Sequence, residues 1–193
     1  MAEHLVHGKI AGIIVFVAVA QFILSVTVAE DIFPGYSVSN NAISDLGVGT
    51  TAPIFNGSII VLGLLLIIAA VLIRSMSHPF SISLILSGVG SIGVGLFPYN
   101  TGVYVHTVSA IFAFLFASAA PYFLITKLKN GISAFWGILG TLGLVSLILS
   151  SLDVNLGLGG GGMERMILYA DIIWALSFSG WLFSHGSQGI QEP

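Results

Sequence analysis

Residues 10–29 read IAGIIVFVAVAQFILSVTVA, an apolar run without a charged side chain. A helix of about 20 such residues crosses the hydrocarbon core of a bilayer, because each residue advances it by about 1.5 Å. The apolar core of a secretory signal peptide is shorter, at about 7–15 residues. We therefore interpret residues 10–29 as a first membrane span.

The rest of the chain has the same character. The 193 residues are 56% hydrophobic and 7% charged, against about a quarter charged in an average soluble domain. Mean hydropathy is +1.05. Further apolar stretches lie at about 54–73, 80–97, 104–126, 132–151 and 164–184. Each is predicted to be a helix, since backbone groups in lipid must be hydrogen-bonded within their segment. The sequence thus predicts an all-α integral membrane protein, with a single membrane domain over residues 1–193 built as a six-helix bundle.

Basic residues predict the orientation of this bundle. On one side of the predicted membrane, together with both termini, lie Lys9, Arg74, Lys127 and Lys129. Arg165 falls on the opposite side, which also carries most of the acidic loop residues. Loops rich in Lys and Arg stay in the cytoplasm. We therefore expect a multi-pass protein of the cell membrane with cytoplasmic N and C termini.

Small residues recur inside the predicted spans, which indicates closely packed helices. They include Ser87, Ser91 and Gly95 in the third span and Gly137, Gly140 and Gly143 in the fifth. The chain has no cysteine, which excludes disulfides, thiolate metal sites and cysteine nucleophiles. Its net charge of −3 is small and unclustered, so a nucleic-acid partner is not expected.

The first outward connection contains the polar segment SNNAISDLG, residues 39–47. Ser39 or Asn40 is predicted to cap a short helix at the membrane interface, and Gly47 to close it. The apolar side of that helix would carry Ala42, Ile43 and Leu46. Two interpretations remain open. Either these polar residues satisfy the backbone of the loop, or Asp45 belongs to a site.

Polar groups elsewhere are predicted at a similar depth, which favours the second interpretation. His106 opens the fourth span, and Glu164 and Arg165 open the sixth. Asp171 lies seven residues after Glu164 on the same side of the helix, about 10 Å further into the apolar layer. A carboxylate at that depth is usually paired or functional. Arg165 or His106 is its expected partner.

Each of these residues also has a structural interpretation. Glu164 can complement a helix N-terminus, Arg165 can anchor the helix at the interface, Asp171 can bond to a neighbouring helix, and His106 can be a packing residue. The functional interpretation makes Asp45, His106 and Glu164 candidate catalytic residues and candidate metal ligands. The candidate lipid- or ligand-binding residues are Ser44, Asp45, Asn56, His106, Glu164, Arg165 and Asp171. No cofactor is predicted, because paired-histidine and HExxH spacings are absent.

One motif match is set aside. Residues 157–162, GLGGGG, satisfy the dinucleotide-binding pattern G-x-G-x-x-G, but a strand–helix–strand unit does not surround them. We interpret them as a flexible outer loop.

The order of motifs along the chain resembles an uncharacterised prokaryotic six-span family. The stretches are NAISDLG (41–47), APIFNGSIIVLG (52–63), GVGLFPYNTGVYVHTVSAIFAF (93–114) and GMERMILYADIIW (162–174). That family looks distantly related to DRAM (damage-regulated autophagy modulator), Sfk and FGF-receptor-activating proteins, which are associated with lipid organisation, GPI-lipid remodelling and autophagy. The resemblance implies roles for Ser44, Asp45, Gly47, Pro53, Asn56, His106, Glu164 and Arg165.

Three functions follow as hypotheses. The sequence favours a non-enzymatic membrane protein that acts on lipid organisation or serves as an accessory subunit of a membrane complex. The alternative is an intramembrane lipid-modifying hydrolase, metal-dependent or not, with a site in the outer leaflet around Asp45, His106 and Glu164. The third is a small proton-coupled transporter that uses Asp171. Expected partners are membrane lipids, with other membrane subunits or further copies of the chain as alternatives.

Overall fold

The computed structural model describes residues 2–185 and is helical throughout its regular structure. The long helices are α1 (Ala2–Ile32), α2 (Ala52–Leu72), α3 (His78–Leu96), α4 (Val103–Leu128), α5 (Gly131–Ser151) and α6 (Gly159–His185). Two short 3-10 helices, η1 (Ile43–Gly47) and η2 (Gly49–Thr51), lie between α1 and α2. Six of the described helices are long and apolar enough to cross a membrane. The chain is therefore a multi-pass, all-helical membrane protein.

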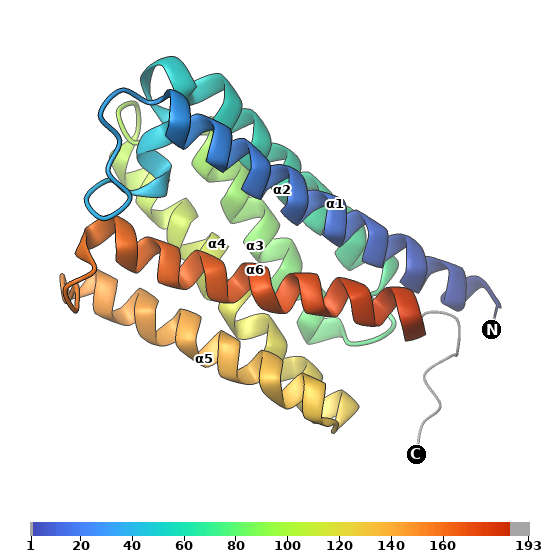
Figure 1. Cartoon of the computed structure of the whole chain (residues 1–193). Helices are drawn as coiled ribbons and strands as arrows, with labels where there is room; N and C mark the ends of the chain where they lie inside the picture. The colour runs from blue at the N-terminus through green and yellow to red at the C-terminus, as the bar shows by residue number, and fades with distance from the viewer. Residues whose placement is uncertain (1, 186–193) are drawn as a thin grey trace.

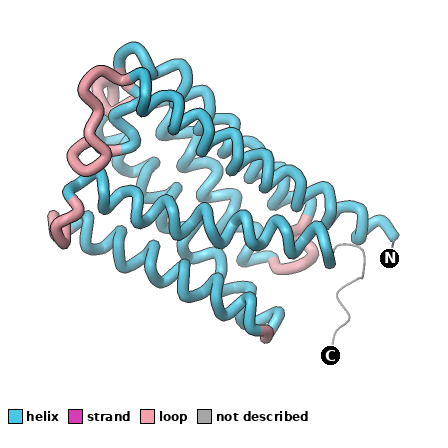
Figure 2. Tube along the Cα trace, viewed as in Figure 1, coloured by secondary structure: helices cyan, strands magenta, loops and turns pink. Residues whose placement is uncertain are grey.

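The six long helices pack in chain order, and α6 closes the bundle by packing against both α5 and α1 (Figure 1). A shorter contact joins α4 directly to α6, with α5 packed behind both. The connections gather at two ends of the bundle (Figure 2). We call the end with residues 33–51, 97–102 and 152–158 the loop end. The opposite end, where α1 begins and α6 ends, is the terminal end.

The helices approach one another closely at small residues, as predicted. A Cβ atom added at Gly63 of α2 would collide with the carbonyl of Gly88 on α3, and the converse holds at Gly88. A Cβ added at Gly95 would lie 2.8 Å from the carbonyl oxygen of Asn56 on α2. Only glycine lets these backbones come so near. Van der Waals packing of this kind associates helices in lipid, where apolar surfaces gain little by leaving the solvent.

An aromatic layer fills the bundle towards the terminal end. The rings of Trp136 and Phe178 meet edge to face, with centroids 5.5 Å apart, and Phe80 packs on Phe178 at 5.0 Å. Both arrangements are favoured by the ring quadrupoles. The indole nitrogen of Trp136 donates to the Ser177 hydroxyl at 2.9 Å, which satisfies its buried polar atom. This layer closes the interior on that side.

The prediction of a flexible loop over residues 157–162 is wrong for most of the segment, because α6 begins at Gly159. The amide of Gly161 donates to the Ser39 carbonyl at 2.9 Å. A Cβ atom there would collide with the carbonyl oxygens of Val38 and Asn41. The glycine run is thus the first turn of a helix on which the segment of residues 38–41 is seated.

Candidate functional site

Arg165 of α6 organises the loop end from a buried position, with 4% of its surface exposed. Its Nη1 donates to the carbonyl oxygens of Val38 at 2.8 Å and Asn41 at 3.2 Å, both in the connection after α1. The same nitrogen donates to the Gly161 carbonyl at 2.9 Å. The guanidinium therefore holds the loop backbone directly, with several donors in one plane.

The other guanidinium nitrogen, Nη2, reaches α1 and the loop beside it. It forms an ion pair with Glu30 and donates to the Tyr36 hydroxyl at 2.6 Å. The guanidinium also lies 5.5 Å from the centre of the Tyr36 ring. Burial raises the pKa of Tyr36 above its ordinary value of 10.0, although the Arg165 bond acts in the opposite direction. The expected pairing of Asp171 with Arg165 or His106 is wrong, because Arg165 pairs with Glu30 and His106 bonds the Phe97 carbonyl.

Asp45 holds the turn that opens η1. Its Oδ2 accepts from the backbone amide of Ala42 at 3.1 Å and from the Asn41 side chain at 3.2 Å. The expectation that Ser39 or Asn40 caps this helix is wrong, since the Ser39 hydroxyl donates instead to the Leu158 carbonyl at 2.7 Å. The predicted short helix and its buried Ile43 and Leu46 are present, as a 3-10 turn.

Glu164 connects α6 to η1. Its Oε2 accepts from the backbone amide of Ile43 at 2.6 Å. Because α6 begins at Gly159, Glu164 lies past the first turn and does not cap its own helix. The acid therefore satisfies the start of η1, which has few internal partners for its first amides.

His106 and Asn56 serve other turns. Nδ1 of His106 bonds the Phe97 carbonyl at 2.9 Å as its N–H donor, which ties the start of α4 to the end of α3. Asn56 donates from Nδ2 to the Gly47 carbonyl at 3.0 Å. Among the described residues, no three His, Asp or Glu side chains are grouped as a metal site requires.

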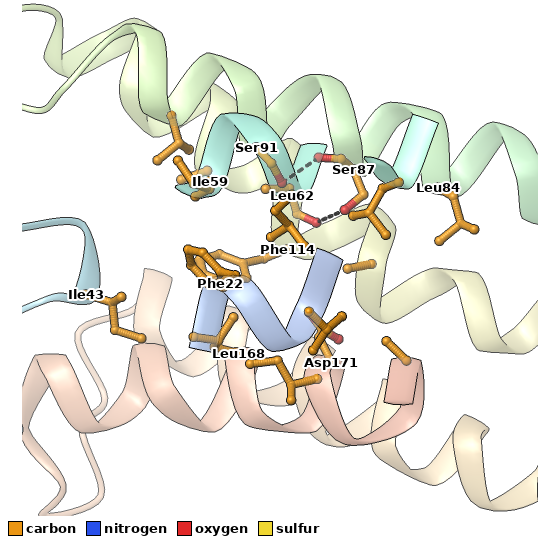
Figure 3. A pocket seen from close by; sticks show the side chains of 18 of the residues that line it. Phe22, Ile43, Ile59, Leu62, Leu84, Ser87, Ser91, Phe114, Leu168 and Asp171 are labelled. Carbon is orange, nitrogen blue, oxygen red and sulfur yellow. Dashed lines mark hydrogen bonds between the residues drawn. The ribbon is translucent and has the colours of Figure 1, made fainter. Parts of the chain in front are cut away.

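A cavity of about 100 Å³ lies between the helices and is partly open to the surroundings. It is lined from α1, α2, α3, α4, α6 and η1. Apolar side chains such as Phe22, Phe114 and Leu168 face it (Figure 3). Ser87 and Ser91 also line it, but their hydroxyls donate to backbone carbonyls of Ala113 and Ser87. The surface offered to a ligand is therefore mostly hydrocarbon.

Asp171 contributes a carboxyl group to this cavity and is 7% exposed (Figure 3). Its Oδ1 accepts from the Ser118 hydroxyl of α4 at 2.9 Å. Gly143 of α5 makes room for that pair, since a Cβ atom there would lie 3.2 Å from Oδ1. Within residues 7–185, Oδ2 has no partner in hydrogen-bonding geometry. Asp171 thus has one carboxyl oxygen that the described residues leave without a well-formed hydrogen bond.

Comparison with known proteins identifies the family. Residues 9–180 match the family described as "Protein of unknown function (DUF998)". The chain belongs to this family. The matched range covers the larger part of every long helix. No curated protein and no solved structure matches the chain.

In this DUF998 member the predicted site residues separate into two groups. Ser44, Glu164 and Asp171 line the cavity, whereas Asp45, Asn56, His106 and Arg165 hold turns and the loop. Sequence reasoning missed Glu30 and Tyr36 as partners of Arg165, and Ser118 as the partner of Asp171. It also missed the apolar lining, because cavity-facing Phe and Leu in a span resemble those that face lipid or another helix.

Proposed function

We propose that this protein is a non-enzymatic membrane protein that holds a lipid in the cavity between its helices. The observation that carries the proposal is the apolar lining of this cavity. The lining extends along α6 from Glu164 to Phe178, which corresponds to about 21 Å at 1.5 Å per residue. One acyl chain fills half of the hydrocarbon core, a thickness of about 15 Å, and the lining is longer than that.

The engagement of the polar loop residues supports a non-enzymatic role. A general base needs a free lone pair aimed at a nucleophile or water. Asp45 and Glu164 accept backbone amides of η1 and its entry, and His106 bonds a carbonyl. These bonds hold the loop and the turn between α3 and α4 in place, which disfavours the hydrolase alternative. The transporter alternative draws on Asp171 alone, because it is the acid that lies deepest along α6.

The membrane placement that we propose follows the charges. Lys9, Arg74, Lys127 and Lys129 belong to segments at the terminal end. By the positive-inside tendency, that end faces the cytoplasm of a cell membrane, and η1 lies at the outer interface. A role in lipid organisation also agrees with the resemblance to the DRAM, Sfk and FGF-receptor-activating proteins, a distant relationship that we retain as part of the proposal.

Native mass spectrometry of protein extracted gently from its own membrane tests the proposal. We expect a lipid mass to remain bound to the parent protein. Ala117→Phe places a ring in the cavity, which Ala117 lines, and should remove that mass. Ala119→Phe is the matched control, because the residue is two positions further along α4 and points to the opposite side.

Two results would contradict the proposal. One is a chain that is bare, or bound only to other protein subunits, which would favour the accessory-subunit role. The other is equal lipid retention in Ala117→Phe and the parent, which would place the lipid on the outer surface.

A further inference from the structure

We infer that the cavity selects a neutral lipid alcohol, whose hydroxyl group binds between the carboxyl of Asp171 and the indole of Trp174. The inference rests on the proposed lipid-binding function and names the class of lipid. It comes from two residues, on neighbouring turns of one helix, that line the same cavity and each carry a buried polar atom without a partner in hydrogen-bonding geometry among the described residues.

The two side chains are placed to act together. Asp171 and Trp174 are three residues apart on α6, so they lie on one face of the helix. They are 7% and 2% exposed. In the described part of the chain, neither Oδ2 of Asp171 nor Nε1 of Trp174 has a partner that meets strict hydrogen-bonding geometry, although the indole is near enough to the carboxyl to act as a weak donor to it. Buried polar atoms without partners are rare and call for an explanation.

A hydroxyl group fits this pair better than other lipid groups. The indole nitrogen can only donate, and an ionised carboxyl oxygen can only accept. A hydroxyl has one proton and two lone pairs, so it can accept from Trp174 and donate to Asp171. It can also accept from both groups if the carboxyl carries a proton. An ester carbonyl satisfies the pair only when Asp171 is protonated, and an ammonium group has no lone pair for the indole.

The depth of the pair limits the size of the polar group. Ser118 donates to Oδ1 at 2.9 Å, which keeps the carboxyl at the α4–α6 contact. On the terminal side, Phe178 lines the cavity as part of the aromatic layer. Towards the loop end, the lining includes Phe55 and Leu168 before Glu164 is reached. A charged phosphate head group would be stranded among these apolar side chains, whereas a single hydroxyl is small enough to be satisfied.

A matched pair of probes tests the inference: radiolabelled 1-hexadecanol and hexadecane, bound to the detergent-purified full-length protein. We expect the parent to bind the alcohol about tenfold more tightly than the alkane, the ratio that about 1.4 kcal/mol of hydrogen bonding gives. Asp171→Leu and Trp174→Phe should each lose most of that preference and still bind hexadecane. Asp153→Asn, an acid-to-amide change in the loop between α5 and α6, should bind both probes as the parent does.

The possible failures are distinguishable. If the parent binds both probes equally tightly, or if Asp171→Leu keeps the parent's preference for the alcohol, the hydroxyl site is overturned while lipid binding stands. If the parent binds neither probe, the proposed function and the inference fall together. Should Asp171→Leu fail to fold, Trp174→Phe decides alone, because it keeps an aromatic ring and removes the donor.

Discussion

The loop end and the cavity differ in how many bonds their polar side chains make. At the loop end, Arg165 and Asp45 make several bonds to backbone and side-chain groups of the protein itself, and Nε of Arg165 and Oδ1 of Asn56 are the atoms there without a partner among the described residues. In the cavity, Asp171 and Trp174 leave one polar atom each without a partner among the described residues. The dense cluster of polar residues at the loop end thus serves to hold the loop in place. The candidate ligand site has few polar groups, and most of them are bonded within the protein.

The largest expected effect is at Arg165. Arg165→Met leaves the Glu30 carboxylate and the carbonyls of Val38 and Asn41 without their donor. Breaking a buried ion pair from one side costs about 3–5 kcal/mol. We expect a large fall in the midpoint of thermal unfolding in detergent. Arg74→Met, the same change at an exposed residue, is the control and should leave the midpoint nearly unchanged.

The cavity should respond differently to a similar change. Asp171→Leu removes a carboxyl that has one partner, Ser118, and one unbonded oxygen. Replacing a poorly satisfied buried group by an apolar one of similar size is often neutral or stabilising. A loss of stability as large as that of Arg165→Met would show that Asp171 is as structural as the loop residues, and the comparison would fail.

Two adjacent glycines provide the next test. Gly161→Ala places a methyl group against the carbonyls of Val38 and Asn41. Such overpacking costs about 1–3 kcal/mol, and the loop should become more sensitive to limited proteolysis. Within residues 2–185, a Cβ atom at Gly160 meets nothing within 4 Å. Gly160→Ala should therefore stabilise the first turn of α6, by up to about 1 kcal/mol. Equal effects at the two positions would show that the loop does not rest on Gly161.

The helices could be predicted from the sequence because the bilayer imposes both their length and their composition. The start of α6 could not. Its glycines are poor helix formers, and they are helical here because Ser39 and Asn41, far away in sequence, pack on them. Asp171 could be placed inside a span from its spacing after Glu164. Its partner depends on how α4 packs against α6, and a serine such as Ser118 gives no signal of that in the sequence.

The smallest expected effect concerns pH at the loop end. Burial raises the pKa of Tyr36, whose hydroxyl accepts from Arg165 and donates to the Ala42 carbonyl at 3.2 Å. The Tyr36 hydroxyl therefore loses its proton at a lower pH in the unfolded chain than in the folded protein. The contribution of Tyr36 to stability is therefore fully present below pH 10 and declines as the pH rises from 10 through the raised pKa.

Thermal unfolding at pH 9 and pH 11 should show this decline in the parent, and Tyr36→Phe should reduce it. Tyr104→Phe is the control, since Tyr104 is 85% exposed and its removal should leave the decline intact. If the two variants respond alike to alkali, the Tyr36 hydroxyl is not held at the loop end as the Arg165 contacts require. The many bonds that set the loop end apart from the cavity would then be fewer by one.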